Sequence, residues 1–279
     1  MFVGLLVLAL GVLVGVGRVM WPVRASSVWV APQPVVSVPA AVTPSAQPTE
    51  LVVRTAAADL PVIDYVHVPA GFPADPQSSS TAALTEGLHP TGKVAVYDAP
   101  GGKPRAFLPA QISGVEVTVP IVDRQSGWVA VLLPSVDRRI GWLPGRTGWT
   151  VRQLRDQLIL RRGAHELTWL RAGVRMRSWT VATGTARTPT PLGRTFVLGR
   201  TTTDGPVYAG LDALVLGSVP EQRDALAPGL RNGHTAIHSW YRASAFGHSV
   251  SNGCIRIPQA GQRTLLSEIA SGSPVSVID

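Results

Sequence analysis

The sequence predicts a mostly β protein, with two β modules and one short helix behind an apolar N-terminal segment and a proline-rich linker. Three observations support this prediction. Short runs of Val, Ile, Leu and aromatic residues recur from residue 88 onward, Gly, Pro and Ser turns separate them, and only the segment after Pro258 has a helical pattern. With 279 residues, of which 45% are hydrophobic and 15% charged, the chain can bury two cores, and disorder throughout is excluded.

The first element is an uncharged apolar run over residues 2–17, FVGLLVLALGVLVGVG. Its length is near the lower limit for crossing a bilayer, so residues 1–21 are expected to be an apolar helix that serves as a signal peptide or membrane anchor. The positive-inside rule, applied to Arg18 and Arg24, would instead place the following chain in the cytoplasm. Only two charges support that reading, and we expect an extracytoplasmic protein.

Residues 22–87 are expected to be a linker. The stretch 32–48, PQPVVSVPAAVTPSAQP, favours an extended polyproline-like backbone over a core. Residues 49–87 remain rich in Ala, Pro and Ser, with some local order expected at 60–68.

Residues 88–149 are expected to form a small antiparallel barrel or sandwich, because its apolar runs are short and turns separate them: KVAVYDA, VEVTVPIVDR, GWVAVLL and IGWLPG. These runs and the Gly-Trp pairs at 127–128 and 141–142 resemble a bacterial SH3-like module. Trp128, Trp142 and Trp149 form either a surface that stacks on sugars or peptides, or part of the core.

Residues 150–279 are expected to form a second β module. Its predicted strands are QLILRR, ELTWLRAG, RMRSWTVATG, GRTFVLGRT, HTAIHSW and SNGCIRIP, and its one predicted helix contains LLSEIA. The polar stretch 201–232, which includes Asp204, Pro206 and Tyr208, is expected to be a lid or a plain surface loop.

Charge and cysteine content exclude several functions. The net charge is +8, and almost all basic residues are arginine, since Lys93 and Lys103 are the only lysines. No basic run is interleaved with aromatic residues, so nucleic-acid binding is not expected, whereas anionic wall polymers or membranes fit the charge. A single cysteine allows neither an intramolecular disulfide nor a cysteine-built zinc site.

Cys254 is a candidate nucleophile, because it follows a Ser-Asn-Gly turn at the start of an apolar run. Such a turn projects the sulfur outward and leaves backbone amides free to face a developing oxyanion. Arg256 would lower the pKa of the thiol. Considered alone, a single cysteine can equally be a small buried apolar residue.

His238 stands 16 residues before Cys254, on a predicted strand, so the loop between them can bring imidazole and thiol together. A Cys–His pair supplies both a nucleophile and a general acid–base. His234 and His248 compete for the same role. No acidic residue lies between them, and the backbone carbonyl of Ser239 is the nearest group that could orient the ring.

Two motifs resemble the L,D-transpeptidases of bacterial cell walls, whose catalytic domain is of the YkuD type. One is His238-Ser239 followed by SNGCIR at 251–256, and the other is TPTPLGRTF at 188–196. The resemblance covers residues 151–279 and implies a β-sandwich catalytic domain. It implies that Cys254 is the nucleophile, that His238 is the general base and acid, and that the Ser239 carbonyl orients His238.

The family also implies an oxyanion hole built from the backbone amides of Asn252, Gly253 and Cys254. Asn252 stands where the family usually has a second histidine, and a backbone donor survives that change. Arg256 is expected to shape the site or to bind a stem-peptide carboxylate, and Tyr208 to contact the substrate from the lid.

The implied reaction cross-links peptidoglycan stem peptides, 3→3, through a thioester, without a metal or an organic cofactor. Carbapenem-type β-lactams are the implied inhibitors, and residues 2–17 would contact the membrane if they are not cleaved. The alternatives are an L,D-carboxypeptidase, an enzyme that anchors proteins to the wall, a non-catalytic wall-binding protein and a membrane-anchored structural spacer.

Overall fold

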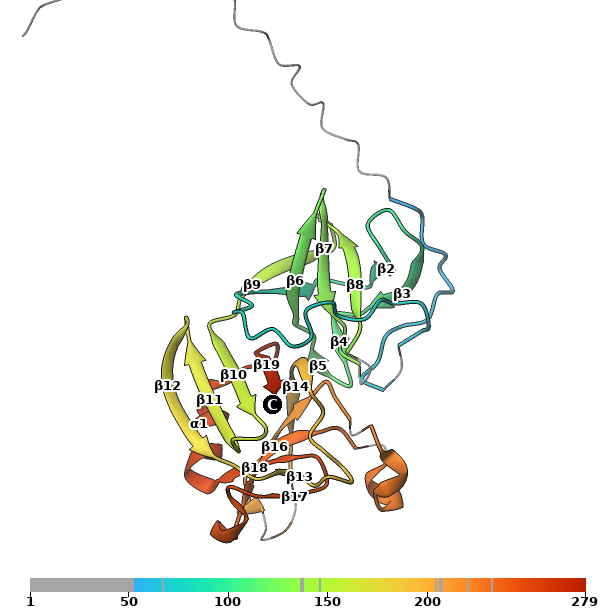
Figure 1. Cartoon of the computed structure of the whole chain (residues 1–279). Helices are drawn as coiled ribbons and strands as arrows, with labels where there is room; N and C mark the ends of the chain where they lie inside the picture. Colours follow the sequence, from blue (N-terminus) through green and yellow to red (C-terminus); the bar gives the residue numbers. More distant parts are fainter. Residues whose placement is uncertain are drawn as a thin grey trace, which may run out of the picture. The chain divides into compact units, whose positions relative to one another are not determined.

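A computed structural model of the chain describes residues 53–66, 68–135, 138–145, 147–203, 205, 208–219, 221–231 and 233–279 (Figure 1). The apolar run 2–17, the proline-rich stretch 32–48, and Asp204 and Pro206 of the predicted lid lie outside these residues. Within the described ranges, no helix has the length and hydropathy that crossing a membrane requires.

The first module is an antiparallel sheet in the order β3-β2-β8-β7-β6-β1-β9 (Figure 1). Its strands are β1 (Glu86–Pro90), β2 (Val94–Tyr97), β3 (Pro104–Leu108), β6 (Val119–Gln125), β7 (Trp128–Leu132), β8 (Ile140–Pro144) and β9 (Trp149–Gln153). A small hairpin adds β4 (Gln111–Ile112) and β5 (Val115–Glu116).

Two of the three tryptophans singled out in this module are core residues. Trp128 is 3% exposed and Trp142 is 7% exposed. The ring of Tyr97 meets that of Trp128 edge to face, at 5.0 Å between centroids. Trp149 is half-buried and donates its indole N–H to the Pro144 carbonyl oxygen at 3.0 Å. Trp128 and Trp142 therefore do not form the exposed stacking surface considered above.

The second module is a mixed sheet in the order β12-β11-β10-β19-β14-β15-β16-β18, in which β10–β19 and β16–β18 are parallel pairs. Its strands are β10 (Asp156–Arg161), β11 (Glu166–Arg171), β12 (Val174–Thr180), β14 (Gly193–Thr201), β15 (Ala213–Leu216), β16 (Ala236–Trp240), β18 (Ile255–Pro258) and β19 (Pro274–Ile278). Figure 1 shows β19 between β10 and β14. Beside the sheet, β13 (Thr183–Gly184) pairs with β17 (Ser249–Ser251).

The helix α1 (Gln259–Glu268) follows β18 directly. It begins at the residue after Pro258, earlier than the predicted LLSEIA core, because a proline fits just before a helix where no N–H is needed. Gln262 on α1 is fully buried and donates its side-chain amide to the Ile237 carbonyl oxygen of β16 at 3.2 Å. Short 3₁₀ segments lie at Arg223–Ala225, Pro228–Leu230 and Ala243–Ala245.

A mostly β fold with one short α-helix is therefore confirmed, with one correction inside the predicted lid. Residues 213–216 form β15, between β14 and β16 in the sheet, within the stretch 201–232 that the sequence predicts to be a lid or a surface loop. Their sequence, Ala-Leu-Val-Leu, is a short apolar run typical of a strand that is buried on both faces.

Residues 53–85, here called the strap, depart from the predicted linker. Ile63 is 1% exposed and Phe72 is 5% exposed, and both belong to the core of the first module. Val62 forms a β-bridge with Phe107 of β3. Ala, Pro and Ser residues supply little apolar surface, and these two large side chains anchor the segment in that core.

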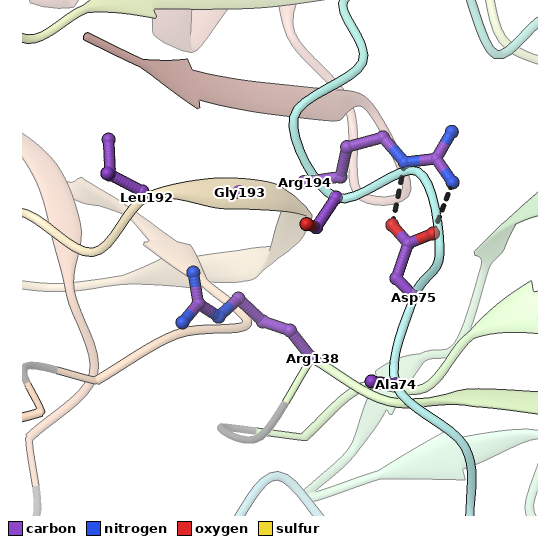
Figure 2. A pocket seen from close by; sticks show the side chains of 7 residues that line it. Ala74, Asp75, Arg138, Leu192, Gly193 and Arg194 are labelled. Carbon is purple, nitrogen blue, oxygen red and sulfur yellow. Dashed lines mark hydrogen bonds and ion pairs between the residues drawn. The ribbon is translucent and has the colours of Figure 1, made fainter.

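The strap also reaches the second module through a buried ion pair. Asp75 accepts hydrogen bonds from Arg194 Nε at 2.7 Å and from Arg194 Nη2 at 2.6 Å, and the two side chains are 2% and 3% exposed. Figure 2 shows this pair at the wall of a pocket that Arg138 and Leu192 also line. A planar guanidinium held at two points by a carboxylate fixes both orientation and distance.

Strand β14 contributes to both hydrophobic cores. Phe196 and Leu198 are 2% and 4% exposed and pack in the core of the first module. Val197, between them, packs in the core of the second module. Because side chains alternate across a strand, the two faces of β14 are both buried, and the modules share this strand.

Candidate active site

The parallel pair β16–β18 brings the predicted catalytic residues to one face of the sheet. His238 is level with Arg256 in the register, and Ile237 is level with Ile255. Cys254 immediately precedes β18 and is therefore level with Ala236. Since strands lie about 4.8 Å apart and rise about 3.3 Å per residue, the Cα atoms of Cys254 and His238 are diagonal neighbours, about 8 Å apart.

The alternation of side chains separates the reactive face from the core face. The side chains on the core face are fully buried: Ile237, Ser239, Ile255 and Ile257. Cys254, Arg256, His238 and Trp240 have the other parity and share the opposite face. The thiol, the imidazole and the guanidinium are thus placed together by two short strands.

His238 is 6% exposed, and its Nδ1 lies 2.8 Å from the carbonyl oxygen of Ser239. A carbonyl only accepts, so Nδ1 carries the proton and Nε2 keeps its lone pair. Burial lowers the pKa of His238 to about 4; the bond to Ser239 opposes this shift, and the charge of Arg256 adds to it. The ring is consequently neutral at pH 7 and can act as a base.

Cys254 is half-buried, and burial raises the pKa of its thiol above the usual value. A hydrogen bond from the Ala236 amide and the charge of Arg256 both lower the pKa of the thiol, but by less than burial raises it. A neutral thiol therefore stands near a neutral imidazole at pH 7. The two pKa shifts favour proton transfer during attack over a preformed thiolate–imidazolium pair.

Arg256 brings a partly desolvated positive charge to the same face. Its guanidinium lies over the Trp240 ring, 3.6 Å from the centroid, and its Nη1 donates to the Val250 carbonyl oxygen at 3.2 Å. Burial lowers its pKa, although an arginine remains charged. Its Nε is buried without a hydrogen-bond partner among the described residues. This cation favours negative charge developing near Cys254.

Tyr208 comes to the site from the stretch predicted to be a lid. Its ring meets the His238 ring edge to face, at 5.0 Å between centroids. Its carbonyl oxygen accepts a hydrogen bond from the Ser239 hydroxyl. The same residue that orients the imidazole through its carbonyl thus holds the Tyr208 backbone through its side chain.

The turn before Cys254 is tied together by the Ser251 hydroxyl. Ser251 Oγ donates to the Cys254 carbonyl oxygen at 2.6 Å and accepts from the Gly253 amide at 3.1 Å. Gly253 has φ +111°, a conformation that glycine adopts without strain. Of the three amides predicted to face an oxyanion, that of Gly253 is therefore engaged inside the turn. Those of the exposed Asn252 and of Cys254 have no acceptor in the part of the chain that the structure describes.

A buried group of threonines supports this turn from behind. Thr190 Oγ1 donates to the Gly253 carbonyl oxygen at 2.9 Å and accepts from the Gly184 amide at 3.0 Å. Thr188 Oγ1 donates to the Ser251 carbonyl oxygen at 3.4 Å. The motif at 188–196 predicts no role for these hydroxyls. No signal in the sequence links these hydroxyls to their acceptors, which lie 63 residues away along the chain.

His234 and His248, the other candidates for the general base, lie in environments that differ from that of His238. His234 Nδ1 lies 2.9 Å from the Leu216 carbonyl oxygen, and its ring meets Tyr65 edge to face at 6.3 Å. Burial lowers the pKa of His234. His248 accepts the Thr183 amide through its backbone carbonyl, at 3.1 Å. Only His238 lies on the strand that pairs with β18.

The described residues contain no group of three or more His, Cys, Asp or Glu side chains that could hold a metal ion.

Comparison with known proteins gives one family match. Residues 155–277 match the model of the YkuD family, which is described as an L,D-transpeptidase catalytic domain. No curated protein sequence gives a significant match.

Several solved structures are similar. An L,D-transpeptidase from Mycobacterium smegmatis has a TM-score of 0.38 and 17% identity, over 58% of this chain and 82% of that one. L,D-transpeptidase 3 from Mycobacterium tuberculosis, in complex with a faropenem-derived adduct, has a TM-score of 0.36 and 18% identity, over 52% and 75% of the two chains. The catalytic domain of the E. faecium L,D-transpeptidase has a TM-score of 0.32 and 20% identity, over 44% and 96%.

Proposed function

Residues 155–277 are an L,D-transpeptidase catalytic domain, and on this premise we propose that the protein forms 3→3 cross-links between peptidoglycan stem peptides through a thioester on Cys254. The proposal rests on one observation: strands β16 and β18 place three groups on the same face of the sheet. These are the thiol of Cys254, the imidazole of His238, whose Nε2 lone pair is available, and the guanidinium of Arg256.

In the proposed acylation step, Cys254 Sγ attacks the carbonyl carbon of the third residue of a tetrapeptide stem while His238 Nε2 takes the thiol proton. The tetrahedral intermediate carries its negative charge on the former carbonyl oxygen. Its collapse breaks the amide bond, and the departing amine of D-alanine takes the proton back from His238. The product is a thioester, and His238 is neutral again.

In the proposed transfer step, the side-chain amine of a neighbouring stem attacks the thioester. The attacking amine gives a proton to His238 Nε2, and the Cys254 thiolate leaves and takes up that proton. One amide bond is broken and one is formed, so no external energy source is needed. The Ser239 carbonyl accepts a hydrogen bond from Nδ1–H in both the neutral and the protonated ring and so keeps the ring in one orientation.

The amides of Asn252 and Cys254 are the proposed oxyanion donors, because the Gly253 amide donates to Ser251 Oγ. Arg256 adds a fixed positive charge to this face and is proposed to shape the site or to bind a stem-peptide carboxylate. Tyr208, in edge contact with His238, is proposed to contact the bound stem.

The purified full-length protein, incubated with disaccharide tetrapeptides, should produce 3→3 stem dimers that mass spectrometry detects. Cys254→Ala should produce none. Release of D-alanine without dimers would instead indicate a carboxypeptidase, and dimers made by Cys254→Ala would overturn the mechanism. Absence of any turnover by the folded parent protein would favour a non-catalytic wall-binding role.

We also propose that the protein works outside the cytoplasm, exported or anchored by residues 1–21, because its substrate is located there. A reporter fused after Pro48 should be active only outside the cytoplasm, and activity confined to the cytoplasm would contradict this. Carbapenem-type β-lactams are the proposed inhibitors, since they would acylate the same thiol.

A further inference from the structure

We propose that Thr190 is a positioning residue for the oxyanion site: its hydroxyl fixes the peptide plane between Gly253 and Cys254 and thereby aims the Cys254 amide at the reacting carbonyl. The inference rests on the proposed function, because it assigns a role within acyl transfer to Cys254. Thr190 itself is fully buried and does not touch the substrate.

The planarity of the peptide bond couples the direction of the Gly253 carbonyl to that of the Cys254 amide. In a trans peptide, the carbonyl of one residue and the N–H of the next point in opposite directions within a rigid plane. The described residues contain no cis peptide, so the Gly253–Cys254 bond is trans. The Gly253 carbonyl is held from the protein interior by Thr190 Oγ1 at 2.9 Å. The Cys254 amide must therefore point away from the interior.

The peptide plane between Ser251 and Asn252 is held in the same manner. The Ser251 carbonyl oxygen accepts from the Thr185 amide at 3.0 Å and from Thr188 Oγ1 at 3.4 Å. The amide in the same plane as this carbonyl belongs to Asn252, the second proposed oxyanion donor. Both donors are thus oriented by one segment, residues 185–190.

This segment has little freedom to move. Thr190 Oγ1 also accepts the Gly184 amide at 3.0 Å, so its hydroxyl proton is directed to Gly253. A Cβ atom on Gly184 would lie 2.1 Å from the Thr188 carbonyl oxygen, which shows how closely the two backbone segments approach. A donor held by such a rigid support is preorganised, and preorganised donors contribute most to transition-state stabilisation.

The test compares Thr190→Val, which removes the hydroxyl at nearly constant shape, with Thr190→Ser, which keeps it. Thr195→Val is the matched control, because Thr195 is 3% exposed and its hydroxyl has no hydrogen-bond partner among the described residues. Two rates are measured on the full-length protein: acylation by a carbapenem, followed by mass spectrometry, and alkylation of Cys254 by iodoacetamide at about pH 9. Alkylation develops no oxyanion and reports only the reactivity of the thiol.

For Thr190→Val, we expect acylation to slow by about 10- to 100-fold while alkylation stays within about threefold of the parent. Thr190→Ser and Thr195→Val should keep both rates within about threefold. Equal losses in both rates would overturn the proposal, since they would indicate general disruption, and so would an unchanged acylation rate.

Circular dichroism checks that each variant is folded. If Thr190→Val does not fold, Thr190→Ala is measured in its place; unfolding of both would contradict a local role for the hydroxyl. Failure of the parent protein to be acylated at all would count against the proposed function, whereas equal acylation of the parent and Thr190→Val would count against this inference alone.

Discussion

The Nδ1 nitrogen of His238 lies 2.8 Å from the carbonyl oxygen of Ser239, the next residue in the chain. This bond fixes the tautomer through a neutral carbonyl, which stabilises a protonated imidazole less than a carboxylate would. Burial then dominates the titration of the ring, and its pKa falls to about 4. A base of low pKa can serve only if the thiol proton moves as the carbon–sulfur bond forms.

The first prediction concerns the acid side of the activity profile. The rate of Cys254 acylation by a carbapenem should be lost as the pH falls through about 4, because protonation of His238 removes the Nε2 lone pair. The neutral base is present above that pH, so the rate should be flat between about 5 and 7. Rates are measured at each pH with circular dichroism as the folding control. A loss of rate centred on the ordinary histidine value of 6.5 would contradict the assignment.

The second prediction concerns the thiol. Burial raises the pKa of Cys254 from its ordinary value of 9.0, so the rate of alkylation by iodoacetamide should have its midpoint above that value. The thiolate is the form that reacts, and it forms only as the pH rises through the raised pKa. A second midpoint between about pH 4 and 7 would instead reveal a thiolate–imidazolium pair.

The third prediction separates the three histidines. His238→Ala should slow acylation by about 10²–10⁴-fold, the usual loss on removing a general base. His234→Ala and His248→Ala should stay within about tenfold of the parent, because neither residue lies on the strand paired with β18. Single-turnover acylation of each folded variant provides the measurement. An inactive His248→Ala together with an active His238→Ala would show that the base is misassigned.

The fourth prediction concerns the strap. Asp75→Asn leaves the Arg194 guanidinium buried without its counter-charge, which should lower the free energy of unfolding by about 3–5 kcal/mol. Glu86→Gln is the control, because it breaks an exposed pair with Arg124 and should cost about 0–1 kcal/mol. Denaturant titrations of both variants give the comparison. Equal, small effects would mean that the strap is not held by the pair.

The sequence predicted the strands that carry the site because β16 and β18 are short apolar runs bounded by turn residues. It paired His238 with Cys254 through the length of the intervening loop. It did not give the register, which places His238 level with Arg256 and so puts the cation on the reactive face. The roles assigned to these residues remain predictions, which the experiments above test.

The strap could not be predicted, because its order depends on partners far away in the sequence. A stretch rich in Ala, Pro and Ser residues is typical of a linker. The sequence around Asp75 does not indicate that its counter-ion is Arg194, which is 119 residues away along the chain. The Thr190 hydroxyl was missed for a similar reason. Its acceptor, the Gly253 carbonyl, is 63 residues away, and a backbone acceptor has no signature in the sequence.

The shared strand β14 and the central strand β19 determine when the protein can become folded during synthesis. A growing chain completes the strands of the first module at Gln153, but that core remains open until Phe196 and Leu198 have been made. Strands β10 and β14 cannot join one sheet until β19 (Pro274–Ile278), the strand that lies between them, has been made. The first core can therefore close only after residue 198 has been made, and the second only near the end of synthesis, so the growing chain is exposed to proteases and to premature strand pairing for much of that time.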